Sequence, residues 1–334
     1  MRKIISILLV FTMLAINLKA QALQFKANKD FKIIQFTDMH YRPGDKESEV
    51  ALKLVNEVLD AEKPDFVVFT GDLAWAGPAK DCFDDVLKPA IDRHIPWAFV
   101  YGNHDDEHDW TRTQIMDYIT QKPYCLATYG DKNLMGEGNY ILEVRSSDDI
   151  SKISTLLYFM DSGSYNNKHK GVGWSYEWFT HEQVDWYRKQ SAAYTAENDG
   201  QPHRALAFFH IPLAEYPIMS ANKEALIGNY KEQECNGKIN TGMFAAMIES
   251  GDVVGTFVGH DHDNDYIGNY MGIALAYGRY SGGNTVYNNL GNNGCRVIEM
   301  KEGDKGFSTY IRLLGGEKLF PVTFPDSFIK EEKK

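Results

Sequence analysis

Five short runs of apolar residues each end at a side chain of the kind that binds metal ions, and no other feature constrains the chain so strongly. The runs cover residues 31–37, 65–70, 97–101, 205–209 and 253–258. They are rich in β-branched and aromatic residues, which predicts buried strands. Functional groups of α/β proteins lie on loops just beyond the carboxyl ends of such strands. We therefore expect the five loops to meet in one cleft.

The side chains that end these runs are carboxylates, imidazoles and one amide. In chain order they are Asp38, His40, Asp72, Asn103, His210, His260 and His262. Such oxygen and nitrogen donors suit Mn, Fe, Zn or Mg, and no cysteine belongs to the set. Two neighbouring metal ions can clamp an in-line displacement at phosphorus. Together the five loops predict a two-metal hydrolase.

The order and spacing of these pieces resemble the motif series of the calcineurin-like metallophosphoesterases over nearly the whole mature chain. Phrases at residues 101–107, 208–213, 257–262 and 277–282 are similar to the branch related to purple acid phosphatases. The resemblance implies an α/β fold, a four-layer α/β/β/α sandwich of two mixed sheets. It places a dinuclear metal site at the C-terminal ends of the strands.

The resemblance also implies a role for each ligand. The first ion would be held by Asp38, His40 and His262, the second by Asn103, His210 and His260, and Asp72 would bridge them. The two ions would be divalent, and their identity among Mn, Fe, Zn and Mg is left open. Glycines precede several ligands at sharp turns, where a side chain would crowd the metals. These glycines are Gly71, Gly102 and Gly259.

Catalytic roles follow from the same resemblance. A metal-bridged hydroxide would attack the phosphate ester, and His104 would protonate the leaving alkoxide, a contribution of about 10²–10⁴-fold. Asp105 is expected to orient His104. Arg279 is a candidate for binding the substrate phosphate, because a guanidinium matches phosphate geometry. Pairing of Arg279 with one of the many carboxylates is the alternative.

One position departs from the purple enzymes. Those enzymes place a tyrosine three residues after the bridging aspartate, and here that position is Trp75, which cannot bind a metal. We therefore expect neither a purple charge-transfer band nor an obligatory ferric ion. Some relatives in this branch are labelled inactive on this ground, but the full set of seven ligands is present here.

The predicted function is metal-dependent hydrolysis of a small phosphate ester, with phosphomonoesters favoured. A phosphodiesterase or nucleotide pyrophosphatase using the same site is the alternative. The second alternative is a binding protein that contains the metals without turning over substrate. Loss of a ligand would favour that reading, and none is missing.

The N-terminus predicts export to the periplasm or the medium. Arg2 and Lys3 precede an apolar stretch over 4–18, and Ala20 offers a small residue for cleavage, so residues 1–20 read as a signal peptide. After cleavage we expect no membrane anchor. Loss of Arg2, Lys3 and Lys19 would change the net charge from −11 to −14, which indicates no affinity for nucleic acid.

The cysteines do not form a metal-binding or redox motif, because no two are close in sequence. They are Cys82, Cys125, Cys235 and Cys295. An exported protein can hold up to two disulfides among them, and free buried thiols are the equal alternative.

The remaining pattern predicts a single domain over residues 25–334. Helices are expected over 47–62, 83–94 (with Pro89 as a kink or break), 112–119, 180–187 and 242–249, and strands over 139–144 and 155–160. A polar connector is expected over 195–203.

Four further segments carry expectations about the site and the second sheet. Residues 166–173 are predicted to be an exposed rim, and the aromatic segment 174–179 is interpreted as core rather than as a substrate platform. Residues 213–240 show too little periodicity to assign, and a lid that faces the substrate is one reading. The runs at 266–277, 295–300 and 307–314 are predicted to be consecutive strands of a second sheet.

Overall fold

Two mixed sheets form the centre of the computed structural model, which describes residues 22–329. One sheet has six strands in the order β13-β12-β11-β1-β2-β3. Its strands are β1 (Asp30–Phe36), β2 (Phe66–Thr70), β3 (Trp97–Val100), β11 (Gly294–Lys301), β12 (Phe307–Leu313) and β13 (Lys318–Phe324). β1, β2 and β3 are parallel, and β11 to β13 are antiparallel neighbours. Every residue of β2 and β3 is buried, as expected for parallel strands that are covered on both faces.

The second sheet has seven strands in the order β4-β5-β6-β8-β10-β9-β7. They are β4 (Tyr140–Arg145), β5 (Ile153–Phe159), β6 (Arg204–Phe208), β7 (Leu226–Ile227), β8 (Val253–Val258), β9 (Ile267–Tyr270) and β10 (Ile273–Tyr277). The central strands β5, β6, β8 and β10 run parallel to one another. The strands that precede the five predicted ligand loops are therefore all members of parallel sets.

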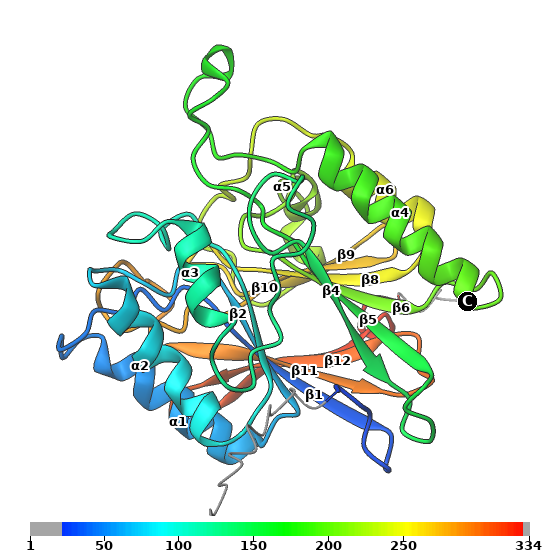
Figure 1. Cartoon of the computed structure of the whole chain (residues 1–334), viewed down its shortest axis with the longest axis horizontal. Helices are drawn as coiled ribbons and strands as arrows, with labels where there is room; N and C mark the ends of the chain where they lie inside the picture. The colour runs from blue at the N-terminus through cyan, green and yellow to red at the C-terminus, as the bar shows by residue number, and fades with distance from the viewer. Residues whose placement is uncertain (1–21, 330–334) are drawn as a thin grey trace, which may run out of the picture.

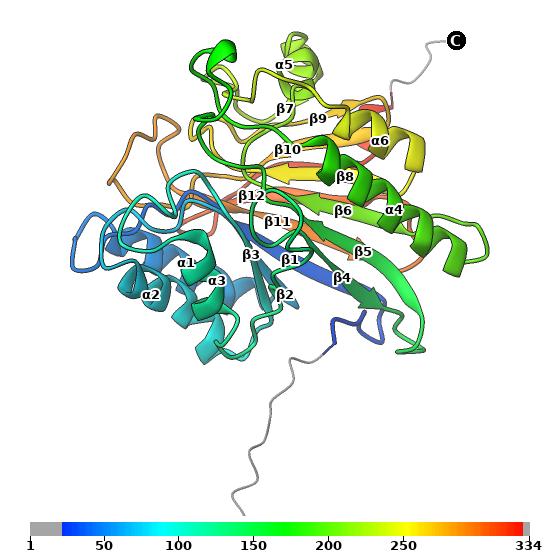
Figure 2. The same cartoon turned by 45° about the horizontal axis from the view of Figure 1, so that its top comes forward.

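Helices cover the outer faces of both sheets. They are α1 (Glu49–Glu62), α2 (Ala79–Asp92), α3 (Arg112–Ile119), α4 (His181–Glu197), α5 (Glu215–Ser220) and α6 (Met243–Ser250), with short 3-10 turns η1 (Lys170–Val172), η2 (Lys223–Ala225) and η3 (Asp326–Phe328). Figures 1 and 2 show α1, α2 and α3 beside the six-stranded sheet and α4 and α6 beside the seven-stranded sheet. The predicted four-layer α/β/β/α sandwich is confirmed.

Alternating side chains of the seven-stranded sheet build the two cores. On β5, Leu156 and Tyr158 belong to the core under α4 and α6, whereas Leu157 and Phe159 belong to the core between the sheets. Phe159 stacks on Phe208 with ring centroids 5.3 Å apart, which continues the inner core onto β6. Burial of each such ring stabilises the fold by about 1.5–3 kcal/mol.

The two sheets meet at the carboxyl ends of their parallel strands. Ser281 N donates to the carbonyl of Thr37 (3.0 Å), which ties the loop after β10 to the loop after β1. Gln35 Nε2 on β1 donates to the carbonyl of Val258 at the end of β8 (3.0 Å). These bonds bring the predicted ligand loops of both sheets to one edge of the molecule.

The prediction that residues 266–277, 295–300 and 307–314 are consecutive strands of one sheet is wrong. β9 and β10 extend the seven-stranded sheet, because β10 pairs with β8 in parallel. The chain then crosses to the other sheet, where β11 pairs with β1 and β12 with β11. Periodicity locates strands, but it carries no information on which strand each one pairs with.

Several boundaries also differ from the predictions. α2 begins four residues earlier than predicted and continues through Pro89, which lacks only one backbone hydrogen bond inside the helix. α4 begins at the predicted capping box of Thr180 and Gln183 but extends to Glu197, into the predicted connector. β13 was not predicted.

The segment 213–240 is not a free lid over its first part. α5 buries Tyr216 and Met219 and contacts β9, so it is a fixed cover of the sheet. The later part, residues 229–235, runs beside the histidine loop, where Cys235 N donates to the Asp261 carboxylate.

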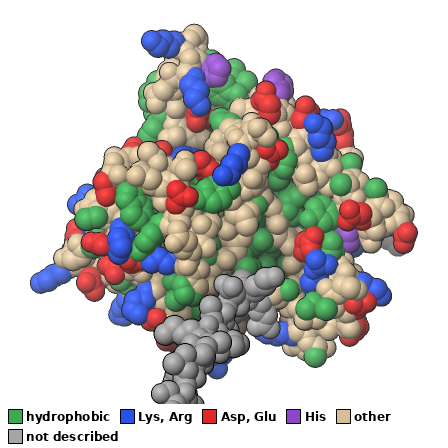
Figure 3. Space-filling model, in the orientation of Figure 1, with side chains coloured by type: hydrophobic (Ala, Val, Ile, Leu, Met, Phe, Trp, Pro, Cys, Tyr) green, Lys and Arg blue, Asp and Glu red, His purple; other side chains and the backbone are tan. Residues whose placement is uncertain are grey.

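Export stays a prediction, because the predicted signal peptide over 1–20 lies outside the described residues. Within residues 22–329, no helix combines the length and hydropathy needed to cross a membrane. All four cysteines are free. The alternative of free buried thiols holds for Cys82 and Cys295, whereas Cys125 is half-buried and Cys235 is exposed. Positive and negative side chains are interspersed on the face shown in Figure 3.

Candidate metal centre

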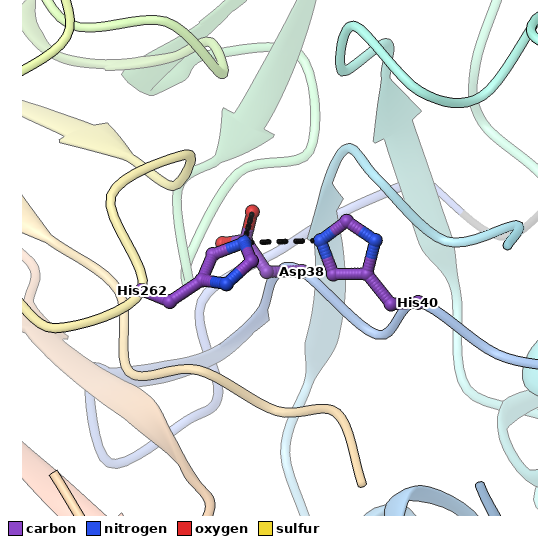
Figure 4. A group of neighbouring side chains, drawn as sticks. All are labelled: Asp38, His40 and His262. Carbon is purple, nitrogen blue, oxygen red and sulfur yellow. Dashed lines mark hydrogen bonds and ion pairs between the residues drawn. The ribbon is translucent and has the colours of Figure 1, made fainter. Parts of the chain in front are cut away.

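Six predicted ligands lie together in two buried groups. One group contains Asp38, His40 and His262, and Figure 4 shows these side chains pointing toward one another. The other group contains Asp72, His210 and His260. In each group one donor atom per residue lies within 4.8 Å of the others. Five of the six residues fall in the group that the sequence assigned to their ion, and Asp72, the predicted bridge, falls in the second group.

In the first group, ring nitrogens face one another. The Nε2 atoms of His40 and His262 are 3.0 Å apart, and His262 Nε2 is 3.6 Å from Asp38 Oδ1. His262 Nδ1 lies 3.0 Å from the carbonyl of Tyr287, so Nδ1 carries the proton and Nε2 presents a lone pair. A cation held by these three residues would satisfy all three side chains at once.

In the second group, a backbone carbonyl fixes the orientation of His210. Its Nδ1 donates to the carbonyl of Thr70 (2.7 Å), which turns Nε2 toward Asp72 Oδ2 at 3.1 Å. Burial by itself lowers the pKa of His210, but the charge and hydrogen bond of Asp72 and the charge of Asp38 raise it to about 10. A position that attracts a proton this strongly also attracts a metal cation.

Asp72 lies between the two groups. Its Oδ2 is 3.1 Å from His210 Nε2 and 3.8 Å from His40 Nε2, so one carboxylate oxygen faces a member of each group. Its Oδ1 accepts a hydrogen bond from His104 N (2.8 Å). Burial opposes ionisation of Asp72, but the neighbouring histidines hold its pKa well below the usual range. This arrangement suits a carboxylate that bridges two ions.

Asn103 completes the donor set with an unsatisfied oxygen. The side chain is buried, and Nδ2 donates to Tyr165 Oη (3.0 Å). Within the described part of the chain, Oδ1 accepts no hydrogen bond. A buried acceptor without a partner costs about 1–3 kcal/mol. The residues present therefore fit a pair of divalent ions, since an ion would satisfy this oxygen.

The backbone at the ligands is strained. Asp38, His40, Asp72 and His260 have φ values of 53°, 40°, 55° and 79°, in the left-handed region that side chains disfavour by about 1–3 kcal/mol each. Neighbouring groups enforce this geometry, as when His260 N donates to both Asp38 carboxylate oxygens. A Cβ on Gly259 would lie 1.9 Å from Thr37 Oγ1, so glycine is required before His260.

The expectation that Asp105 orients His104 is wrong. Asp105 instead accepts hydrogen bonds from four backbone amides of the neighbouring loops. The donors are the amides of Asp72 (2.9 Å), Leu73 (2.7 Å), Ala74 (3.3 Å) and Gly102 (2.8 Å). Burial, followed by the charge of Asp72, raises the pKa of Asp105 to about 6, and the amides counter that shift. Asp105 thus holds the loop that carries Asp72.

The carboxylate that contacts His104 belongs to Glu107 and not to Asp105. His104 Nδ1 lies 2.6 Å from Glu107 Oε2. The ring of Trp75 packs edge-on against both His104 (4.7 Å) and His40 (4.8 Å), so this residue supports two site histidines without binding a metal. The spacing of Glu107, three residues after His104, was the signal that could have identified it.

Arg279 does not support the predicted contact with substrate. Its side chain is buried and pairs with Asp265 Oδ2 at 2.6 Å. The same guanidinium donates to the carbonyls of Leu290 and Asn292. All three nitrogens of the guanidinium are thus hydrogen-bonded inside the fold, and the alternative of a carboxylate partner describes the structure.

The aromatic segment 174–179 is core only at its end. Phe179 is buried, as interpreted, but Trp174 is 72% exposed. Tyr176 packs edge-on against His260 with ring centroids 4.3 Å apart. The interpretation as core is therefore wrong for Trp174 and Tyr176, because the segment projects beside the site before it enters the fold.

Comparison with known proteins places the chain in one family by two independent routes, a family model and individual relatives. A model described as calcineurin-like phosphoesterase matches residues 31–264. A protein of Arabidopsis thaliana named probable inactive purple acid phosphatase 29 is 35% identical over 286 residues, which cover 77% of this chain and 73% of that protein. Phosphatase DCR2 of Saccharomyces cerevisiae is 34% identical over 334 residues, which cover 90% of this chain and 56% of that protein.

A solved structure supports the same fold. A dimetal phosphatase from Danio rerio superposes with a TM-score of 0.60 at 14% sequence identity, covering 88% of this chain and 99% of that one. At this level of identity the likeness concerns the fold alone.

Proposed function

Because the chain belongs to the calcineurin-like phosphoesterase family, we propose that it hydrolyses phosphate esters and favours phosphomonoesters. The observation that carries this proposal is the pair of buried ligand groups with Asp72 between them. Two plant relatives are named probable inactive purple acid phosphatases. The term inactive is part of the names of those proteins and does not refer to this chain. In this chain all seven predicted ligands are present.

Two divalent ions of the Mn, Fe, Zn or Mg class would be held by the predicted ligand set. Asp38, His40 and His262 would hold one, Asn103, His210 and His260 the other, and Asp72 would contact both. When bound, such ions lower the pKa of a water and withdraw charge from the phosphoryl oxygens. Trp75 offers no phenolate, so we expect no purple colour.

The charge of the donor set favours a phosphomonoester. The set contains two carboxylates, Asp38 and Asp72, and its other members are imidazoles and one amide, which are neutral when they hold an ion. Burial and neighbouring histidines keep the pKa of His40 and that of His260 low, which maintains the neutral form that ligation requires. Two divalent ions would then leave a formal excess of two positive charges on the ligand set, or one with the attacking hydroxide included. A monoester dianion gains more from this excess than a diester monoanion does.

His104 is the proposed proton donor to the leaving group. It lies at the site because its backbone amide donates to Asp72 Oδ1, and Glu107 fixes the imidazole from the other side. The ring is partly exposed, with 22% of its side-chain surface accessible, so it can reach a substrate oxygen. Asp105 acts as a positioning residue for the Asp72 loop.

Hydrolysis of 4-nitrophenyl phosphate beside bis(4-nitrophenyl) phosphate tests the proposal after reconstitution with each metal. Preference for the monoester supports it. Preference for the diester would select the phosphodiesterase or pyrophosphatase alternative. Two bound ions without turnover of either ester would select a non-catalytic binding protein. Export belongs to the same proposal, and N-terminal sequencing of the mature protein tests cleavage after Ala20.

A further inference from the structure

The segment between β5 and α4 forms a projection that the proposed reaction does not use. Residues 163–180 rise from the body of the molecule in both views (Figures 1 and 2, green). Backbone hydrogen bonds join its two arms, from Asn166 N to the carbonyl of Ser175 (2.9 Å) and from Glu177 N to the carbonyl of Ser164 (2.7 Å). The projection is therefore a short hairpin rather than an irregular loop.

The base of this hairpin is fixed to the ligand loop after β3. Arg112 donates to the carbonyls of both Gly102 (2.8 Å) and Gly163 (3.1 Å), which links the two segments through one guanidinium. Ser164 Oγ donates to the carbonyl of Asn103 (3.3 Å). The position of the hairpin relative to the metal centre is thus set by hydrogen bonds at its base.

Three aromatic rings on the hairpin lead from the metal centre to solvent, and we name Tyr165, Trp174 and Tyr176 the aromatic wall. Tyr176 packs edge-on against His260 at 4.3 Å, and Tyr165 stacks on Tyr176 at 5.4 Å with 30° between the rings. The hydroxyl of Tyr165 accepts from Asn103 Nδ2. Trp174 contacts Tyr176 at 5.4 Å and ends the series.

Within residues 22–329, the outer ring of the wall is left largely uncovered. Trp174 is 72% exposed, although a ring of this size gains free energy when its surface leaves water. Two lysines also lie on the hairpin, and Lys168 pairs with Glu177 (3.3 Å). Beyond its phosphate, a substrate on this side would therefore meet the three aromatic rings directly beside the metal centre.

We propose that the aromatic wall binds a planar ring in the leaving group, so that the preferred substrates are phosphate esters of an aromatic ring system. This inference rests on the proposed function, because it takes the phosphate to lie at the metal centre beside His260. Contact between aromatic rings contributes about a three- to tenfold change in affinity for one ring. Aryl phosphates and nucleoside monophosphates share this chemistry.

The test compares Trp174→Ala and Trp174→Phe with Met271→Ala, a control whose side chain is similarly exposed (70%) but lies between β9 and β10. For the metal-loaded protein, kcat/KM is measured with 1-naphthyl phosphate and glycerol 2-phosphate. A second pair, adenosine monophosphate and ribose 5-phosphate, separates nucleosides from simple aryl groups. Calorimetric binding of phenylphosphonate and methylphosphonate gives a readout that does not depend on turnover.

We expect Trp174→Ala to lower kcat/KM for the esters with an aromatic ring about three- to tenfold, mainly through KM, and to leave the esters without an aromatic ring within twofold. Trp174→Phe should recover most of the loss, and Met271→Ala should change nothing. Equal losses on both kinds of ester, or no loss on either, would overturn the inference while the proposed function stands. If no ester is hydrolysed, the proposed function fails, and weaker binding of phenylphosphonate alone by Trp174→Ala still supports the wall.

Discussion

His104 Nδ1 and Glu107 Oε2 lie 2.6 Å apart, which places a carboxylate directly behind the imidazole that faces the metal centre. The pair is local, since one turn of backbone separates the two residues, and the His104 amide is held by Asp72. One nitrogen of His104 is thereby occupied, and Nε2 is left for the substrate. We therefore expect different effects from replacing His104, the proposed proton donor, and Glu107, which positions it.

Replacement of His104 by alanine should slow hydrolysis most for substrates with poor leaving groups. We expect kcat for glycerol 2-phosphate to fall about 10²-fold or more, because an alkoxide needs a proton as it leaves. The loss for 4-nitrophenyl phosphate should be much smaller, since 4-nitrophenolate is stable without a proton. Steady-state kinetics on both esters measures this difference, with exposed His108→Ala as the control. Equal losses would exclude His104 as the acid.

Glu107→Ala should reproduce part of that effect through disorder of the His104 ring. We expect kcat for the alkyl ester to fall about tenfold with KM within twofold, because Glu107 touches the imidazole and not the substrate. Glu107→Gln keeps an acceptor for Nδ1 and should recover most of the activity. A loss that appears in KM alone would contradict the positioning role, and Glu224→Ala serves as the exposed control.

Asp105→Asn should destabilise the protein and weaken metal binding together. The Asp105 carboxylate accepts hydrogen bonds from four backbone amides. In asparagine one of the two carboxylate oxygens is replaced by an NH₂ group, which would face backbone N–H donors and could not accept from them. We expect the free energy of unfolding to fall by about 2–4 kcal/mol, since hydrogen bonds to a charged group contribute about 1.5–3 kcal/mol. Urea unfolding of the metal-free protein measures the first effect. A variant as stable as the exposed control Asp131→Asn would contradict this account.

A predicted pH dependence comes from the far end of α1. Burial by itself raises the pKa of Glu62, but hydrogen bonds from Lys32, Tyr310 and Lys318 outweigh it and lower the pKa to about 2. Because the folded pKa lies below the ordinary value of 4.5, this stabilisation is present above pH 4.5 and is lost as pH falls toward 2.

Glu62→Gln should therefore lower the free energy of unfolding by about 2–3 kcal/mol at pH 7. It should also flatten the pH dependence of stability between pH 4.5 and 2. Denaturant unfolding across this range measures both effects. Glu249→Gln removes an exposed ion pair with Arg188 and should lower the free energy of unfolding by only about 0–1 kcal/mol. An equal loss in the two variants would contradict the stabilising role of the hydrogen bonds around Glu62.

The sequence was sufficient to identify the parts of the fold and site whose signals are local. The ligand loops were found because each ligand follows an apolar run directly, and the structure places Asp72 and His210 at the ends of β2 and β6. The helix after Thr180 was found because its capping box is a pattern of neighbouring residues. The α/β class was implied by the family resemblance, which the same local motifs carry.

The rest depended on contacts between distant segments or on the geometry of a turn. Asp105 was predicted to orient His104, which is its neighbour in sequence, but the turn directs the Asp105 carboxylate back to the amide of Gly102. Arg279 seemed available for phosphate, but the β9–β10 hairpin brings Asp265 to it from fourteen residues away. The pairing of β11 with β1 joins opposite ends of the chain, and no local pattern reports it.

The central claim is that two ions joined by Asp72 make this chain a phosphoesterase. Titration of the metal-free protein with Mn²⁺, followed by bound metal and by hydrolysis of 4-nitrophenyl phosphate at each point, tests it most directly. We predict two ions per chain, turnover that appears only as the second ion binds, and fewer ions without turnover in Asp72→Asn. Full turnover by the metal-free protein, or by Asp72→Asn, would contradict the claim.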